Sequence, residues 1–382
     1  MFLPRLAHAS GRCRLRPIVS GLRKTVAAAP DSPFRETSMT FTITRRTLLG
    51  GAALLVASPA LLRAQTRTLN LYSSRHYDTD EALYSDFTKQ TGITINRVEA
   101  GEDPLLARLQ SEGANSPADV LITVDAGRIE RASSLGLLQP FASEALASRI
   151  PANLRDPDGH WFGFSTRARV LFVAKDKVPE GAIGSYEDLA DPKWKGKVLI
   201  RSSTNIYSQS MTGAILAALG PEKTEAWARG LVANLARPPR GGDTDQLRAA
   251  AAGEGDIAVS NTYYFGRLTV STKPEDRAVV EKLRIVFPNQ GDRGTHVNIS
   301  AAGIARHAKN LDAAKAFLEY LATPSAQRYF AFGNHEYPVV AGVEPPPHVA
   351  AWGTFKVDSL NARVFARNNA EALKIMDRAG WK

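Results

Sequence analysis

The chain has 382 residues, of which 44% are hydrophobic and 8% aromatic, which is the composition of a globular protein with room for two domains. Its formal charge of +10 would ordinarily suggest binding to nucleic acid or to an anionic membrane. Residues 1–64, however, hold ten Lys and Arg against two acidic residues, so they carry +8 and residues 65–382 carry only +2. The folded part is therefore nearly neutral, which argues against a nucleic-acid partner.

Residues 39–64 have the order of an export signal. Arg45 and Arg46 precede an apolar run at 50–62, which is too short to span a bilayer, so we expect a cleavable signal and no stable membrane insertion. Paired arginines are typical of the twin-arginine route, which reads the signal as an address and not as an anchor. We therefore predict a periplasmic protein.

Residues 1–38 are rich in Arg, Pro and Ala, and Met39 stands directly before the signal. We interpret residues 1–38 as an extension that is either disordered or not part of the native protein. The one cysteine, Cys13, would then be absent from the mature chain. Its absence would exclude thiolate metal sites and cysteine nucleophiles.

Strands and helices alternate in the first part of the folded chain. We expect strands at 68–72, 93–98 and 118–124 and helices at 78–91, 103–112 and 126–135. This alternation indicates a parallel sheet covered by helices. A long strand at 163–175 follows and could cross into a second domain.

The rest of the chain contains a second α/β unit and a return to the first. We expect strands at 194–200, 257–259 and 283–287, helices at 208–219, 222–236 and 244–252, a returning strand at 296–304, helices at 311–321 and 325–332, a Pro-rich joint at 344–347 and a last helix at 359–378. The predicted fold is α/β with two lobes and hinge strands between them. The N-terminal lobe would comprise 65–165 and 292–343, and the C-terminal lobe 166–291 and 344–382.

Four tyrosines and a histidine follow predicted strands. They are His76, Tyr77, Tyr207, Tyr263 and Tyr264, and the last two are expected in a polar turn. Ligands collect at the carboxyl ends of strands in open α/β sheets. Phenol oxygens could bind an oxygen-loving cation there if their pKa fell from about 10. The alternative is that these tyrosines are structural, as most tyrosines are.

Four motifs carry a resemblance to a known family. They are Leu71-Tyr-Ser-Ser-Arg-His-Tyr77, Leu189-Ala-Asp-Pro-Lys-Trp-Lys-Gly-Lys197, Arg201-Ser-Ser-Thr-Asn-Ile-Tyr207 and Gly255-Asp-Ile-Ala-Val-Ser-Asn-Thr-Tyr-Tyr264. From about Thr68 to Lys382 the chain resembles the ferric-iron-binding periplasmic proteins of ABC importers, which have the type II, Venus-flytrap fold. Within that family it is similar to the branch that binds iron through tyrosines and a histidine. The other branch uses a glutamate and a synergistic anion.

The resemblance implies a ligand set and a function. The implied iron ligands are Tyr77, Tyr207, Tyr263 and Tyr264, with His76 as a ligand or a close neighbour. Arg167 is implied to contact the ligands without binding the metal itself. The implied protein is a monomer that captures Fe(III) in the cleft between its lobes, is not an enzyme, and delivers iron to an ABC transporter permease. Iron bound between the lobes would favour the closed state.

The chemistry of the residues agrees with this implication. Fe(III) prefers anionic oxygen and can deprotonate a phenol. Four phenolates and one ferric ion leave a charge of −1, which Arg167 could compensate, so we expect no requirement for a synergistic anion. Because the phenols must lose protons, affinity should fall as the pH drops.

The sequence also allows other ligands and another solute. His76 could donate a hydrogen bond to a phenolate instead of binding the metal, and Glu99, Glu102 or Asp103 could supply a carboxylate ligand. Hydroxyl side chains before predicted helices would suit an oxyanion such as sulfate or a phosphonate; they are Ser73, Ser74, Ser202, Ser203 and Thr204. That solute would leave the four tyrosines unexplained. No hydrolase or zinc-protease motif is present to favour an enzyme.

Overall fold

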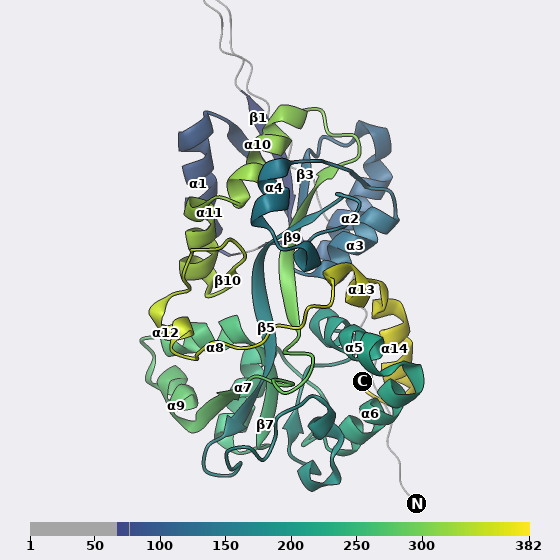
Figure 1. Ribbon diagram of the computed structural model, residues 1–382, viewed down its shortest axis with the longest axis vertical. Helices are drawn as coiled ribbons and strands as arrows, with labels where there is room; N and C mark the ends of the chain where they lie inside the picture. Colours follow the sequence, from purple (N-terminus) through teal and green to yellow (C-terminus); the bar gives the residue numbers. More distant parts are fainter. Residues whose placement is uncertain (1–66, 76) are drawn as a thin grey trace, which may run out of the picture. The chain divides into compact units, whose positions relative to one another are not determined.

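The computed structural model describes residues 67–75 and 77–382, and Figure 1 shows the arrangement of their helices and strands. The predicted signal at 39–64, the extension at 1–38 and His76 lie outside the described residues.

The first lobe contains a mixed sheet with the strand order β2-β1-β3-β9-β5. Strands β1 (Thr68–Ser73), β2 (Thr94–Glu99) and β3 (Val120–Thr123) are parallel, whereas β9 (Val297–Ala305) pairs antiparallel with both β3 and β5. Its helices are α1 (Asp80–Thr91), α2 (Glu102–Glu112), α3 (Ala126–Ser134), α4 (Glu144–Arg149) and α10 (Leu311–Leu321), and the short β4 (Leu138–Gln139) adds to β9. The central strand β9 thus comes from much later in the chain than its neighbour β3.

Strand β5 (Phe162–Ala174) is shared by the two lobes. All thirteen of its residues are buried. Its first part, up to Ala168, pairs with β9, and its second part, from Arg169, pairs with β7 (Ile257–Asn261) and β8 (Leu283–Val286). A strand buried on both faces shows no alternation of buried and exposed residues, and the polar residues at 165–167 and 169 are buried along with the apolar ones. The predicted crossing strand is confirmed, and Figure 1 shows β5 running through both lobes.

The second lobe is built around β6 (Val198–Leu199), β7 and β8. Its helices are α5 (Ile206–Leu219), α6 (Pro221–Ala233), α7 (Asp243–Ala252), α8 (Thr262–Thr269) and α9 (Pro274–Lys282). The strand predicted at 194–200 is much shorter than expected, because Pro192–Trp194 forms a 3-10 turn in which the Asp191 side chain accepts from the Lys193 amide.

The C-terminal part is more broken than predicted. The helix expected at 325–332 consists of α11 (Pro324–Arg328) and a π-helical segment (Tyr329–Gly333), and it is followed by β10 (Tyr337–Pro338) and α12 (Pro347–Ala350). The helix expected at 359–378 is two helices, α13 (Ala362–Arg367) and α14 (Asn369–Arg378). The break comes at Asn368, whose side-chain amide donates to the Gly213 carbonyl of α5 at 2.9 Å. Helix α13 contacts both α3 and α5, so it touches both lobes.

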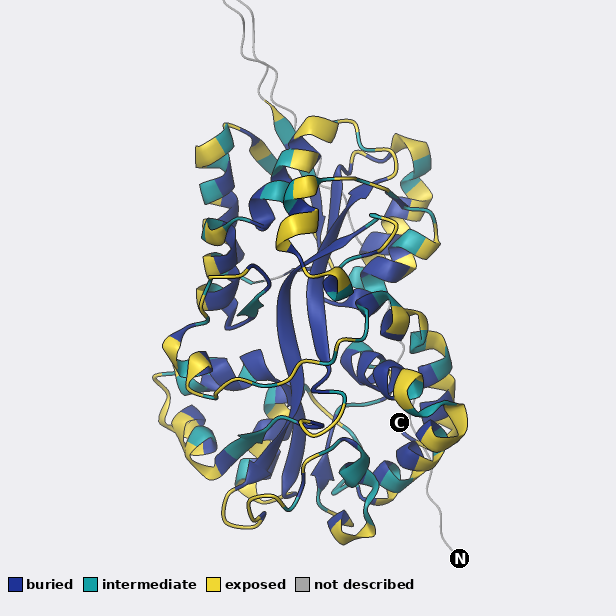
Figure 2. Cartoon of the chain, viewed as in Figure 1, coloured by how far each residue is buried: buried dark blue, intermediate teal, exposed yellow. Residues whose placement is uncertain are grey.

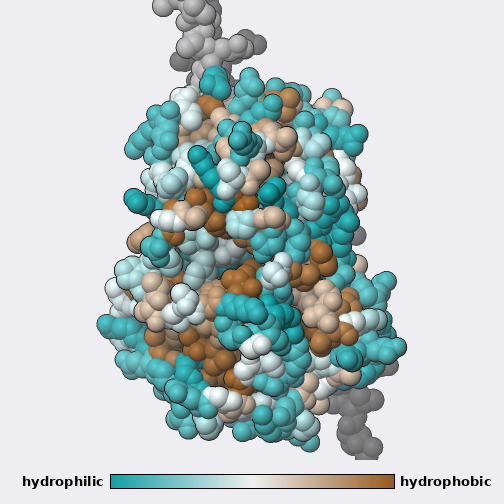
Figure 3. Space-filling view, viewed as in Figure 1, coloured by the Kyte–Doolittle hydropathy of each residue, from teal (hydrophilic) through white to brown (hydrophobic). Residues whose placement is uncertain are grey.

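Most apolar side chains lie inside the lobes. Figure 2 shows buried strands at the centre of each lobe and exposed residues mainly on the outer sides of helices. On the face drawn in Figure 3, hydrophilic residues predominate and smaller apolar areas lie among them. Among the helices in the described ranges, none has the length and apolar character needed to cross a membrane.

Candidate metal site

The adjacent tyrosines Tyr263 and Tyr264 lie in the first turn of α8, not in the polar turn that we predicted. Strand β7 ends at Asn261 and α8 begins at Thr262 without an intervening loop. The Asn261 amide donates to Asp243 Oδ1 at 3.1 Å, and Thr262 Oγ1 accepts from the Ala168 amide of β5 at 3.3 Å. These contacts fix the strand end and the helix start together. The two tyrosine rings lie 4.2 Å apart between centroids.

Tyr207 also lies at a helix start. It is the second residue of α5, whose N-cap residue Asn205 accepts a hydrogen bond from the Tyr207 amide at 3.2 Å. The starts of α5 and α8 meet, and the hydroxyl oxygens of Tyr263 and Tyr207 are 3.2 Å apart. Both side chains are buried.

Tyr77 approaches this pair from the first lobe. The Arg267 guanidinium of α8 lies 5.1 Å from the Tyr77 ring centre, 5.3 Å from that of Tyr263 and 5.7 Å from that of Tyr264. One cation therefore touches three of the four tyrosines, and it joins Tyr77 to the second lobe. We refer to Tyr77, Tyr207, Tyr263 and Tyr264 as the tyrosine cluster.

A fully buried ion-pair network supports the cluster from the first lobe. Arg75 Nη1 and Arg167 Nη2 approach the two carboxylate oxygens of Glu336 at 3.3 and 2.6 Å, and both donate to Ser300 Oγ at 2.7 Å. Arg75 also binds Asp80 with two hydrogen bonds of 2.6 and 2.9 Å. The Arg75 guanidinium lies 4.8 Å from the Tyr77 ring centre, and that of Arg167 lies 5.7 Å from the Tyr263 ring centre.

A second ion-pair network lies beside Tyr207. Asp243 pairs with Arg169 and, at 3.1 Å, with Arg201. The two guanidiniums lie 6.0 and 5.8 Å from the Tyr207 ring centre. Counted with Arg267, five guanidiniums lie around the tyrosine cluster, and three carboxylates, those of Asp80, Glu336 and Asp243, pair with four of them.

The surroundings keep the phenols protonated when no metal is bound. Burial raises the pKa of Tyr207 and Tyr263 well above that of an ordinary phenol, and negative charge on the neighbouring tyrosines would raise it further. Burial and then the charge of Asp243 raise the pKa of Tyr264. Burial acts to lower the pKa of Arg167, but the charge of Glu336 and the smaller effects of the neighbouring tyrosines together outweigh burial, so the pKa is raised. The arginine therefore stays a cation.

The structure thus brings Tyr77, Tyr207, Tyr263, Tyr264 and Arg167 together, while His76 lies outside the described residues. The other candidate ligands have partners outside the tyrosine cluster. Glu102 accepts from the Val124 amide at 3.1 Å and pairs with Arg128 at 3.4 Å. Glu99 pairs with Arg97, and Asp103 with Arg128 and Arg131. Ser202 and Thr204 bind each other through their hydroxyls at 2.6 Å.

Several charged groups at the site were missed from the sequence, among them Arg75, Arg267 and Glu336. Arg75 stands inside a motif beside His76 and Tyr77, so its place in the motif could have drawn attention to it. Arg267 follows the tyrosine pair by one helical turn, which would have been informative only with the helix recognised. Glu336 is distant in the sequence from both arginines that it binds, and no local sequence pattern predicts that it pairs with them.

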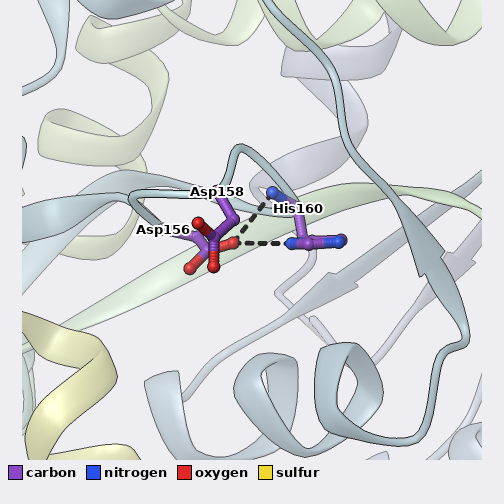
Figure 4. A group of neighbouring side chains, drawn as sticks. All are labelled: Asp156, Asp158 and His160. Atoms are coloured by element: carbon purple, nitrogen blue, oxygen red, sulfur yellow. Dashed lines mark hydrogen bonds and ion pairs between the residues drawn. The ribbon is translucent and has the colours of Figure 1, made fainter.

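A separate group in the first lobe consists of Asp156, Asp158 and His160 (Figure 4). One potential ligand atom from each lies within 4.8 Å of the others. His160 Nδ1 lies 2.8 Å from Asp156 Oδ2, and Arg363 Nη1 lies 3.1 Å from Asp156 and 2.7 Å from Asp158. Because the Arg363 guanidinium already supplies the positive charge between the two carboxylates, we assign this group to an ion-pair network.

Comparisons with known proteins identify a family of solute-binding proteins and relatives named for iron uptake. A family model described as bacterial extracellular solute-binding protein matches residues 82–357. The "Iron uptake protein A2" of Synechocystis sp. is 51% identical over 351 residues, which cover 90% of this chain and 100% of that protein.

Solved structures extend the similarity to three dimensions. A Trichodesmium protein designated IdiA or FutA, in complex with iron and citrate ligands, matches with a TM-score of 0.81 and 55% identity over 82% of this chain and 100% of that one. Apo FutA2 from Synechocystis matches with a TM-score of 0.80 and 52% identity over 83% and 100% of the two chains. The predicted two-lobed α/β fold and the predicted family are confirmed.

Proposed function

Because this chain belongs to the family of bacterial extracellular solute-binding proteins, we propose that it is a periplasmic protein that binds ferric iron between its two lobes through phenolate oxygens. The observation that carries this proposal is the tyrosine cluster. It gathers four phenol groups from both lobes within a basic surrounding. The names of the relatives, which refer to iron uptake and to bound iron, support the choice of metal.

Ferric iron suits this set of groups better than the solutes of the competing interpretations. Its high charge favours anionic oxygen ligands and can remove phenol protons that no neutral solute would remove. An oxyanion would be drawn to the arginines and could accept hydrogen bonds from the phenols, but it would not require four anionic oxygen ligands. His76 remains a predicted ligand or hydrogen-bond partner of a phenolate. No catalytic step is part of the proposal.

We further propose that no synergistic anion is required. Four phenolates and a ferric ion carry −1, and the surrounding arginines, which outnumber the carboxylates paired with them, can balance it. Arg167 is not the sole source of this balance, because Glu336 already neutralises part of its charge. The balance rests instead on Arg267 and on the Arg169 and Arg201 pair.

Binding between the lobes provides a signal for transport. Tyr77 belongs to the first lobe and Tyr207, Tyr263 and Tyr264 to the second, so iron bound to all four would stabilise the closed state. An ABC transporter permease would then recognise the closed monomer and receive the iron. Export would use the predicted cleavable, twin-arginine signal.

A visible titration tests the proposal. Residues 65–382 would be titrated with ferric citrate, alongside Tyr207→Phe, Tyr263→Phe and the control Tyr84→Phe. Tyr84 is a buried tyrosine of α1 that packs on Phe317 at 6.2 Å. We expect a phenolate-to-iron absorption band that saturates at one equivalent in the parent and the control and weakens or shifts in the other two variants.

The titration can also refute the proposal or show that an anion is required. The absence of a band in folded protein would refute the proposal. The same titration with ferric nitrilotriacetate tests the anion: loss of the band without citrate or carbonate would show that an anion is needed.

A further inference from the structure

A buried carboxylate, Asp125, connects the two lobes close to the tyrosine cluster. It follows β3 in the first lobe and caps α3, where its Oδ1 accepts from the Gly127 amide at 2.6 Å. Its Oδ2 accepts from Asn298 Nδ2 of β9 at 2.7 Å. The Ser210 hydroxyl of α5 lies 3.1 and 3.3 Å from the two oxygens. Asp125 and Ser210 both have no exposed surface.

The position of Ser210 relates this contact to iron. Ser210 and Tyr207 lie three residues apart on α5, so they are neighbours on one side of the same helix. A helix moves as a stiff unit, and a contact that holds Ser210 also holds Tyr207. The contact crosses from α3 to α5, which belong to different lobes, and it lies beside β9 where that strand enters the first sheet.

We propose that Asp125 is a positioning residue for iron binding, whose hydrogen bond to Ser210 holds α5 and Tyr207 against the first lobe in the closed state. This inference rests on the proposed function. Asp125 does not touch the metal; it acts through α5. The closed state gains the hydrogen bond, and iron affinity gains with it because the metal requires the closed state.

The hydrogen bond between Asp125 and Ser210 does not depend on whether Asp125 is protonated. Burial, with a smaller effect of the nearby Glu102, raises the pKa of Asp125 to about 7, while its hydrogen bonds to Gly127 and Ser210 and the charge of Arg167 oppose the rise. A hydroxyl can donate to a carboxylate and accept from a carboxylic acid. The pair can therefore remain bonded in either protonation state.

A matched pair of variants tests the inference. Ser210→Ala removes the hydroxyl that crosses between lobes. Ser208→Ala makes the same change at an equally buried position of the same helix, where the hydroxyl donates to the Arg201 carbonyl within the second lobe at 3.4 Å. Iron affinity would be measured by competition with citrate, and the stability of the iron-free protein by urea unfolding.

We expect Ser210→Ala to bind iron about tenfold more weakly and Ser208→Ala to stay within about twofold of the parent, since the lost hydrogen bond leaves a buried acidic group without a partner in the second lobe. The two iron-free variants should unfold at similar urea concentrations. Equal affinities in the two variants would overturn the inference, and so would a loss of iron-free stability in Ser210→Ala that matches its loss of affinity. Failure of the parent and Ser208→Ala to bind iron would instead refute the proposed function.

Discussion

Iron binding should release at least three protons per metal ion at neutral pH. The pKa values of Tyr207, Tyr263 and Tyr264 all lie above that of an ordinary phenol, so these groups are neutral before iron binds. Each must become a phenolate to bind a ferric ion. Bringing one phenol of pKa 10 to the anion at pH 7 costs about 4 kcal/mol, because each pKa unit corresponds to about 1.4 kcal/mol. For three phenols iron must therefore supply at least about 12 kcal/mol.

Calorimetry in two buffers with different ionisation enthalpies measures the number of protons released. The same titration without protein corrects for protons exchanged by the iron chelate. The Tyr263→Phe variant should release about one proton fewer than the parent, and Tyr84→Phe the same number as the parent. Affinity should rise with pH and be lost as the pH falls, because acid restores the phenols. A proton count that is unchanged in Tyr263→Phe would show that this tyrosine does not bind the metal as a phenolate.

Two substitutions test the buried ion pairs of Glu336 and the packing of α13 on α5. Glu336→Gln leaves the buried Arg75 and Arg167 without their shared carboxylate, so urea unfolding at neutral pH should show a loss of about 3–5 kcal/mol. Glu371→Gln, at a half-exposed surface ion pair, should lose less than about 1 kcal/mol. Burial alone would raise the pKa of Glu336, but the two arginines lower it on balance, so its stabilising effect should be present at neutral pH and disappear in acid below about pH 4. Gly213→Ala would place a Cβ 2.5 Å from the Phe365 carbonyl of α13 and should lower the free energy of unfolding by about 1–3 kcal/mol. A Cβ at Gly184 would have no other atom within 4 Å, so Gly184→Ala should leave the stability unchanged. Equal stabilities of the two variants would argue against close packing of α13 on α5.

The sequence was sufficient for the fold class because hydrophobic period and length separate strands from helices. It also identified the tyrosine cluster, since residues at the carboxyl ends of strands converge in an α/β fold. The start of α8 was missed because Tyr263 and Tyr264 are aromatic residues that favour strands over helices. Their helical conformation depends on contacts with Asp243 and Ala168, which are remote in the sequence.

The same limit applies to the charges around the site. Arg167 was recognised on the crossing strand, but its partner Glu336 lies 169 residues away, and no local pattern links them. The break between α13 and α14 likewise depends on Gly213, where the absence of a side chain lets the Phe365 carbonyl approach α5. Pairings of this kind come from tertiary structure and cannot be inferred from local periodicity.

The position of β9 has a consequence for how the protein is made. The first sheet places this strand between β3 and β5, although at least 120 residues separate it from either of them along the chain. During synthesis β1, β2 and β3 therefore emerge long before the strand that covers their edge. Until residues 297–305 appear, that edge is unpaired and open to aggregation or to chaperones. Contacts so distant in sequence also slow folding, so the first lobe, although it begins earlier, cannot be completed before most of the second has been synthesised.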